Sequence, residues 1–435
     1  MIRRELINII AGYNFWGKEQ ETGISRETLK KASKFVRKGT ALSIVGIRKC
    51  GKTYLTKQIL AEKISEGKKK EQTVYINFED PSFEPYLSTS LLDDTYETYR
   101  YYLNKDKTAF IVLDEIQNIE KWEKWVRTML EKKEDIQLII TGSSSKLLSS
   151  EIASLLTGRT ITVSLYPLSF KEFIIFKGFK EFLTEQKALV FLEEFIEFGG
   201  FPMVVLAENQ EFKTIYLKEI FGGILTRDIV KRYEIRQEHE LRSLAVLLIN
   251  NFSSFVSVNK LRNIMYNVTK IKLSPTTINN YLKYFSDPFL FFFIPIFSYK
   301  IKDPLQYPKK VYCIDTGIIN KVSQKFSQDK GKLYENIVGV ELVKRFGKEN
   351  IFYWKSKQQE EIDFLVKQQK PETLIQVCYD LKPENKKREL KPLLKASKEL
   401  KCNKLLVITR NYKKTEMYKR KKINFVPLWE WLLQD

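Results

Sequence analysis

The residues with the clearest chemical potential lie together in the first part of the chain, directly after a short apolar run. They read Gly46-Ile47-Arg48-Lys49-Cys50-Gly51-Lys52-Thr53, which is the pattern G-x-x-x-x-G-K-T of a phosphate-binding loop. The two glycines lack the Cβ that restricts other residues, so the backbone can turn its N–H groups toward phosphate oxygens. The pattern predicts that Lys52 binds the β- and γ-phosphates of ATP and that the Thr53 hydroxyl is a ligand of Mg²⁺.

The sequence on either side of this loop favours the same interpretation. The apolar run at residues 41–45 predicts a buried strand, and residues 53–65 place Leu55 and Ile59 on one face of a helix. Strand, glycine-rich loop and helix form the context that a P-loop requires, so we assign residues 46–54, Tyr54 included, to the nucleotide site. The alternative is an ordinary glycine turn between a strand and a helix.

A pair of acids ends the next strand but one after the loop. Asp114 and Glu115 follow the apolar run at residues 109–113, in the pattern known as Walker B. Asp114 is predicted to hold Mg²⁺, directly or through water, and Glu115 to orient the attacking water or take its proton. An apolar strand that ends in acids is a weak signal alone, but it becomes specific when a P-loop precedes it.

Three more residues are candidates for catalysis. Thr141 and Ser143 end the following strand, where a hydroxyl could contact the γ-phosphate or the water; the alternative is an ordinary N-cap for the next helix. Arg159 precedes the strand after that and is a candidate arginine finger, which would reach the nucleotide of a neighbouring subunit in a homo-oligomer. Its alternative is a surface salt bridge, and Arg227 is a weaker candidate for a sensor in the same chain.

The overall composition bears on partners and location. The chain has 74 Lys and Arg against 53 Asp and Glu, a net charge of +21, which suggests DNA as a partner, although a lysine-rich proteome would have the same effect. The four cysteines have no disulfide or zinc spacing, and the single histidine, His239, makes a Ser-His-Asp triad improbable. With no signal peptide and no apolar run long enough for a membrane span, we expect a cytoplasmic protein without a membrane partner.

The pattern of apolar residues predicts an α/β protein of four parts. Residues 40–165 alternate strand and helix, so we assign residues 1–165 to a parallel-sheet P-loop core, and residues 166–238 read as a helical lid. Residues 239–303 read as a winged helix-turn-helix, with its wing strands in the phenylalanine-rich run. Residues 304–435 return to mixed α/β structure.

The third helix of the predicted winged helix carries a polar face. It opens at Ser274-Pro275, and Thr276, Asn280 and Lys283 recur at helical spacing opposite apolar residues. Such a face can enter the major groove of DNA, and the basic segment 382–422 could add phosphate contacts. The alternatives are a winged helix that packs only against other protein, and a basic segment that is simply solvated.

Short motifs along almost the whole chain resemble one family, the archaeal and bacterial ATPases of the AAA superfamily that carry a C-terminal domain of uncharacterised function. The motifs are NFW at 14–16, GIRKCGKT at 46–53, VLDEIQ at 112–117, TGSSS at 141–145, LTGR at 156–159, LYPLSFKEF at 165–173, GGFP at 199–202, YCIDTG at 312–317, YEN at 334–336, EIDFLV at 361–366 and IQVCYDL at 375–381. LYPLSFKEF and EIDFLV are the most specific. The resemblance implies an ATPase core, a winged helix and a C-terminal module similar to PD-(D/E)xK nucleases, a restriction-endonuclease-like α/β fold.

The same resemblance implies that Asn14 and Trp16 lie near the adenine; the alternative is plain core packing. In the nuclease-like module, Glu335 and Asp363 fit two of the expected acids, which would bind Mg²⁺. The remaining two positions are occupied by Gln376 and Cys378 instead of an acid and a lysine. Glutamine is a poor ligand beside a carboxylate and cysteine cannot replace an ammonium, so we expect a catalytically degenerate module.

These observations predict a cytoplasmic, Mg²⁺-dependent ATPase that associates with DNA. The alternative is a slow regulatory nucleotide switch that controls assembly with a protein partner. An active ATP-dependent nuclease is the less favoured third hypothesis, because of Gln376 and Cys378.

Overall fold

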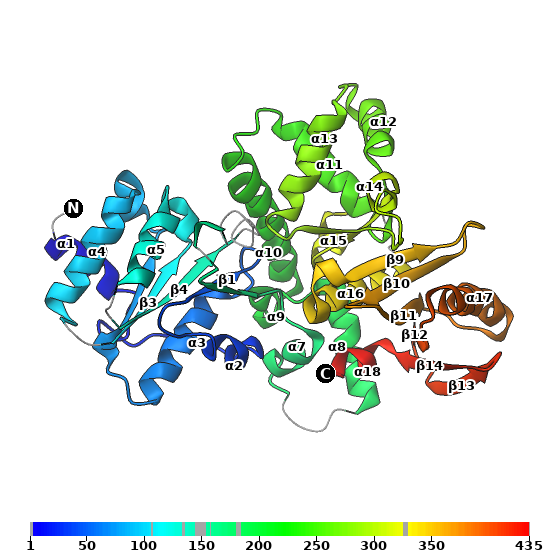
Figure 1. Ribbon diagram of the computed structural model, residues 1–435, viewed down its shortest axis with the longest axis horizontal. Coiled ribbons are helices and arrows are strands. Elements are labelled where there is room, and N and C mark those ends of the chain that lie inside the picture. Colours follow the sequence, from blue (N-terminus) through cyan, green and yellow to red (C-terminus); the bar gives the residue numbers. More distant parts are fainter. Residues whose placement is uncertain are drawn as a thin grey trace. The chain divides into compact units, whose positions relative to one another are not determined.

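The computed structural model of the chain describes residues 3–105, 108–132, 135–143, 154–156, 158–179, 184–324 and 329–434. It divides into two compact units, Met1–Tyr166 and Pro167–Asp435, each of which is described by itself (Figure 1). Three residues of the motifs quoted above, Ser144, Ser145 and Thr157, lie outside the described residues.

Unit 1 is built on a five-stranded sheet of order β2-β3-β4-β1-β5, in which every neighbouring pair is parallel. The central strands are fully buried, as runs of β-branched and aliphatic residues predict for a sheet covered on both faces. The observed sheet confirms the predicted α/β class with a parallel core. The strands are β1 Ala41–Val45, β2 Thr73–Asn77, β3 Ala109–Asp114, β4 Ile136–Gly142 and β5 Thr160–Ser164.

Helices connect these strands because parallel neighbours need a crossover. Figure 1 shows α4 and α5 on one face of the sheet and α3 on the other. The carboxyl ends of the strands therefore meet at one edge, which brings together residues that follow β1, β3 and β4. The helices of unit 1 are α1 Arg3–Ala11, α2 Thr28–Ser33, α3 Lys52–Ser65, α4 Thr89–Tyr102 and α5 Trp122–Glu131.

Unit 2 begins with helices, as expected from the sequence. Phe170, Phe173 and Phe195 pack their rings together in its first part. No strand occurs among the described residues between Pro167 and Gln237. The helices are α7 Phe170–Phe176, α8 Glu185–Phe198, α9 Pro202–Leu206, α10 Gln210–Gly223 and the π-helix Ile224–Lys231.

The next part of unit 2 runs helix, strand, helix, helix, strand, helix, strand, and its three strands form an antiparallel sheet of order β6-β8-β7. The phenylalanine-rich run supplies only β7, and its partner β8 follows after a long connection that contains α14. The boundary that we predicted at residue 303 therefore passes through this sheet. The elements are α11 Glu238–Asn250, β6 Ser254–Val256, α12 Val258–Thr269, α13 Pro275–Ser286, β7 Phe291–Ile294, α14 Asp303–Gln306 and β8 Lys309–Cys313.

The last part of unit 2 is a six-stranded mixed sheet of order β13-β14-β12-β11-β10-β9. Helix α17 covers one face with Leu390 and Leu393, which share a core with Leu365 and Val407 of the sheet. The pattern of apolar residues did not reveal β13 and β14. The elements are α15 Thr316–Val322, α16 Lys330–Phe346, β9 Ile351–Lys355, β10 Glu361–Lys367, β11 Pro371–Cys378, α17 Pro383–Leu400, β12 Lys404–Thr409, β13 Lys414–Tyr418, β14 Lys421–Pro427 and α18 Leu428–Leu433.

Candidate nucleotide site

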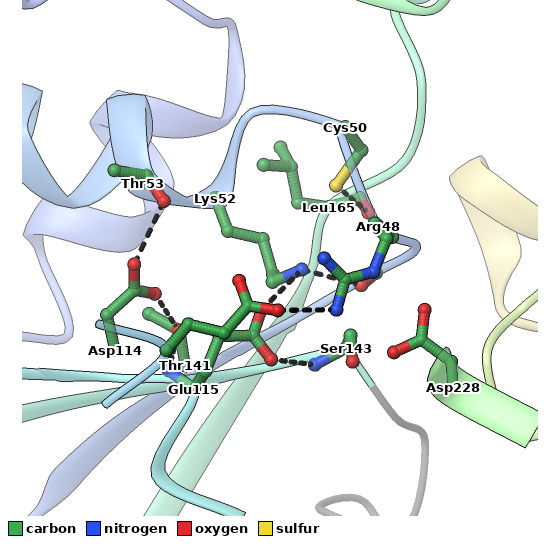
Figure 2. A network of polar contacts seen from close by, with 12 residues as sticks. Arg48, Cys50, Lys52, Thr53, Asp114, Glu115, Thr141, Ser143, Leu165 and Asp228 are labelled. Carbon is green, nitrogen blue, oxygen red and sulfur yellow. Dashed lines mark hydrogen bonds and ion pairs between the residues drawn. The ribbon is translucent and has the colours of Figure 1, made fainter. Parts of the chain in front are cut away.

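The predicted phosphate-binding loop connects the carboxyl end of β1 to the amino end of α3 (Figure 2). Two residues of the loop have positive φ, Lys49 at 65° and Gly51 at 102°. At Gly51 the loop therefore uses a conformation that glycine favours. At Gly46, a Cβ would lie 2.0 Å from the carbonyl oxygen of Leu165, so only glycine fits there. Among the described residues no side chain caps the N-terminus of α3, which leaves that helix end open to an anion.

Two buried side chains hold the loop in place. The Cys50 thiol donates to the carbonyl oxygen of Leu165 at 3.3 Å, and burial raises its pKa, so it packs as a neutral thiol. Arg26 donates to the carbonyl oxygens of Cys50 at 2.7 Å and Tyr166 at 2.9 Å. Sequence reasoning missed Arg26, because it lies far before the loop and no motif marks it.

Lys52 and Glu115 form a buried ion pair at the centre of the site. The Lys52 Nζ lies 3.2 Å from Glu115 Oε1 and donates to the carbonyl oxygen of Gly46 at 3.1 Å. Burial opposes both charges, but the pair outweighs it: the pKa of Lys52 is raised and that of Glu115 is lowered to about 2. Both residues are therefore charged at neutral pH.

Thr53 and Asp114, the two predicted Mg²⁺ ligands, lie in direct contact. Thr53 Oγ1 donates to Asp114 Oδ2 at 2.9 Å, and the hydroxyls of Tyr75 and Thr141 also donate to the carboxyl group. Burial, reinforced by the charge of Glu115, raises the pKa of Asp114. An oxygen-only set of a hydroxyl and a carboxylate fits Mg²⁺, which prefers hard ligands and commonly takes one or two from protein.

The backbone and side chains beside β4 fix the Glu115 carboxylate. Glu115 has φ 54°, and its own N–H donates to Thr141 Oγ1 at 3.0 Å. The N–H of Ser143 donates to Glu115 Oε2 at 3.2 Å, and Gln117 donates to the same oxygen. Thr141 thus lies beside both acids and Ser143 beside Glu115, as Figure 2 shows, and their contact with a γ-phosphate stays a prediction.

The other predicted residues of the loop have different surroundings. Ile47 is buried, whereas Arg48 forms an ion pair with Glu79 at 2.6 Å. The Tyr54 ring is 48% exposed and lies against Gly23, where a Cβ would come within 2.9 Å of the ring.

Asn14 and Trp16 lie along the outer strand of the unit 1 sheet. The Asn14 amide donates to the carbonyl oxygens of Ile10 at 2.7 Å and Tyr75 at 2.8 Å, and accepts from the Tyr75 N–H at 2.6 Å. Trp16 Nε1 donates to the carbonyl oxygen of Thr73 at 3.0 Å. These contacts give both residues a role in closing the edge of β2, and their predicted proximity to adenine stays untested.

Arg159 lies away from the phosphate-binding loop of its own unit. Its carbonyl oxygen accepts from the N–H of Ala41, at the amino end of β1, while the loop follows the carboxyl end. Its guanidinium is half exposed and lies 3.4 Å from Glu131. Arg159 is therefore a surface residue, and its action on a neighbouring subunit, like the sensor role of Arg227, stays a prediction.

In unit 2, Glu335 and Asp363 both contact Lys310, and their membership of a nuclease-like module stays a prediction. Sequence reasoning missed Lys310 and Glu361, which the structure adds. Lys310 comes from β8, outside the four expected positions, so no spacing within the module could have identified it.

Comparisons with known proteins match three segments of the chain to domain families. A model described as an AAA domain matches residues 38–174, and two domains of unknown function, DUF8612 and DUF4143, match residues 191–329 and 330–431. The solved structure of the Aeropyrum pernix ORC1 protein in complex with DNA is similar over 74% of this chain and 91% of that chain, with 11% identity and a TM-score of 0.33.

Two uncharacterized proteins are similar over most of their length. One from Methanocaldococcus jannaschii is 41% identical over 90% of this chain and 87% of its own, and one from Haemophilus influenzae is 31% identical over 90% and 94%. The parallel sheet, the P-loop and the match at residues 38–174 define an AAA-type domain in this chain. The chain belongs to the family of these two relatives. Among the described residues, no helix is both long and apolar enough to cross a membrane.

Proposed function

We propose that this protein binds ATP with Mg²⁺ and hydrolyses it in unit 1. The observation that carries the proposal is the buried pair of Lys52 and Glu115, with the Glu115 carboxylate fixed by the N–H of Ser143 at 3.2 Å. A buried, ionised carboxylate beside a phosphate-binding loop can accept a hydrogen bond from the attacking water and orient it.

Each residue of the site has a separate task in this proposal. The loop N–H groups and Lys52 hold the phosphates, and Lys52 neutralises charge as the γ-phosphoryl group leaves. Thr53 and Asp114 would hold Mg²⁺, which supplies further neutralisation of the phosphate oxygens. Glu115 orients the attacking water. The Thr141 hydroxyl fixes the positions of the two acids, because it donates to Asp114 and accepts from the N–H of Glu115.

Association with DNA is the second part of the proposal. Thr276, Asn280 and Lys283 of α13 are exposed while Ile278 and Phe285 are fully buried, so the helix presents the expected polar face. The order helix, strand, helix, helix, strand, short helix α14, strand supports a winged helix whose last two strands, β7 and β8, pair antiparallel. The basic segment 382–422 supports DNA binding less than its charge suggests, since Lys391 and Lys395 pair with Glu360.

One observation favours the slow switch as a second candidate. Lys52 is held by Glu115 and by the carbonyl oxygen of Gly46, so phosphate binding must compete with two existing partners. A protein in which Lys52 must first leave these partners can bind ATP and hydrolyse it slowly, and its ATP-bound state would control assembly with a protein partner.

Steady-state ATP turnover in the presence of duplex DNA, RNA or no nucleic acid tests the proposal. We expect Mg²⁺-dependent turnover that DNA increases and that Lys52→Ala abolishes by weakening nucleotide binding. Tight ATP binding with turnover that no nucleic acid changes would favour the switch. Failure to bind ATP would contradict both functions.

A further inference from the structure

A buried lysine lies at the centre of the acidic cluster of unit 2. Lys310 of β8 is 2% exposed, and its ammonium contacts three carboxylates from two other elements. The Nζ lies 2.9 Å from Glu335 of α16, and 2.5 Å and 3.0 Å from Glu361 and Asp363 of β10. The three N–H bonds of an ammonium therefore have three carboxylate acceptors.

The surrounding structure directs these acids toward the lysine. The pairing of β10 with β9 has a bulge between Ile362 and Leu365, which allows Asp363 to face Lys310 while those two residues join the core under α17. Tyr312 donates to Glu335 at 2.7 Å, and the N–H of Val377 donates to Asp363 at 2.9 Å. The cluster is thus fixed from β8, β11 and α16 as well as from β10.

We propose that the Lys310 ammonium takes the place of a divalent cation in this cluster, so that unit 2 contains a closed site that needs no metal. An ammonium and a metal ion would compete for the same carboxylate oxygens, and Mg²⁺ demands near-octahedral ligands at about 2.0–2.1 Å. Among the described residues, no three His, Cys, Asp or Glu side chains are placed to hold a metal ion. The acids are instead arranged at hydrogen-bond distance around nitrogen.

The charges of the cluster agree with this assignment. The Glu335 side chain is 14% exposed, and its burial together with the charge of Asp363 raises its pKa to about 7 even beside Lys310. Near neutral pH one of the three acids is therefore partly protonated, which reduces the excess negative charge without a metal. The anionic neighbours outweigh burial and raise the pKa of Lys310, so the ammonium stays charged.

This assignment says how the nuclease-like module differs from an active nuclease site. The positions of its missing acid and lysine, Gln376 and Cys378, carry no charge, and the lysine that the cluster does contain comes from a different strand. Because Lys310 belongs to the β6-β8-β7 sheet, the ion pairs of the cluster connect that sheet to α16 and β10. The predicted winged helix and the nuclease-like module should therefore behave as one body.

The test compares Mn²⁺ binding by the full-length chain before and after removal of the lysine. Both proteins carry Asp114→Asn, which removes the predicted metal ligand of unit 1, and no nucleotide is added. We expect that Lys310→Ala creates one Mn²⁺ site, detected by electron paramagnetic resonance, and lowers Tm by about 6 °C or more. Mn²⁺ should then raise the Tm of this variant and leave that of the parent unchanged.

A second variant keeps the test decisive if Lys310→Ala folds poorly. Lys310→Met combined with Glu335→Gln and Asp363→Asn removes the charges together, so it should have a higher Tm than Lys310→Ala and gain no Mn²⁺ site. The proposal is overturned if the parent already binds one Mn²⁺ that Glu335→Gln abolishes, since metal and lysine would then coexist. It is equally overturned if the combined variant is no more stable than Lys310→Ala.

Discussion

At the scale of single residues, the site keeps the Glu115 carboxylate ionised at neutral pH although it is buried. The Lys52 ammonium at 3.2 Å outweighs burial and holds the pKa of Glu115 at about 2, so this side chain can accept a hydrogen bond from water at any pH near neutral. The same low pKa makes it a weak base. Its contribution is therefore to orient the water more than to remove its proton early.

Glu115→Gln should retain ATP binding and reduce turnover by about 10²- to 10⁴-fold, because only the water-orienting carboxylate is lost. Binding is measured with a fluorescent ATP analogue and turnover by phosphate release. The matched control is Glu120→Gln, a change at an exposed acid in the segment that follows β3, and this variant should behave as the parent. Undiminished turnover in Glu115→Gln would remove this residue from the mechanism.

Glu335 should make the stability of unit 2 depend on pH. Its pKa is about 7 in the folded chain, against an ordinary value of 4.5 for a glutamate, so the folded state holds a proton more tightly between these two pH values. Stability should fall as pH rises from 4.5 to 7, by up to about 3 kcal/mol. Glu335→Gln should flatten this part of a plot of Tm against pH, and an equal slope in both proteins would contradict the assigned pKa.

At the scale of elements, the outer strand β2 is closed by a side chain instead of another strand. Asn14 is 1% exposed and bonds both the N–H and the carbonyl oxygen of Tyr75, as a neighbouring strand would. This arrangement protects an edge that could otherwise pair with another chain. It also places Tyr75 so that its hydroxyl reaches Asp114, which links the edge of the sheet to the site.

Asn14→Ala should destabilise unit 1 by about 2–4 kcal/mol, because two buried backbone groups of Tyr75 lose their partner. Asn8→Ala on the exposed face of α1 is the control and should cost less than about 0.5 kcal/mol. Chemical denaturation measures the difference. If Asn14→Ala instead keeps its stability and loses ATP affinity, the role near adenine is favoured over the role at the strand edge.

The exposed face of α13 makes a prediction about DNA. Duplex DNA should bind with an affinity that falls steeply with salt, and Lys283→Ala should reduce the slope of log K against log salt by about 1. Asn280→Ala should weaken any sequence preference, since asparagine pairs with adenine in the major groove. Lys218→Ala, an exposed lysine of α10, is the control. Affinity that is independent of salt would leave α13 as a packing element.

At the scale of the whole molecule, the open question is whether one chain forms a complete site. Arg159 and Arg127 both lie next to Glu131, at 3.4 Å and 3.3 Å, so they are matched in charge, exposure and partner. A surface salt bridge of this kind contributes at most about 1 kcal/mol. If Arg159 acts in catalysis, its substitution should therefore reduce activity, while substitution of the similar Arg127 should not.

Arg159→Ala should lower kcat by a factor of up to about 10³ without a change in ATP affinity, whereas Arg127→Ala should leave both unchanged. Mixing Arg159→Ala with Glu115→Gln protein should restore part of the activity, because each supplies what the other lacks. Sedimentation establishes the oligomeric state under the same conditions. Equal behaviour of the two arginine variants, in a chain that stays monomeric, would rule out an arginine finger.

Local patterns were sufficient for the parallel core and its site. A loop of the form G-x-x-x-x-G-K-T after a buried strand predicts where phosphates bind, and parallel strands bring Asp114 to the same edge. The sequence also located α13, through its opening at Ser274-Pro275, and β7, through the phenylalanine-rich run. The apolar period could not locate β13, which has no buried residue, and it missed β14 although the buried residues of that strand alternate. It also missed β8, the partner of β7, because β8 comes after a long connection.

By itself, the sequence determined the class of the core, the residues of the loop and the two acids, since each depends on neighbours along the chain. Only the tertiary structure decided which distant groups complete them. Arg26, Tyr75 and Lys310 carry no motif, and each acts through a buried contact with a residue far away in sequence. Burial makes such contacts selective, because a charged or polar group removed from water must find a partner wherever the fold provides one.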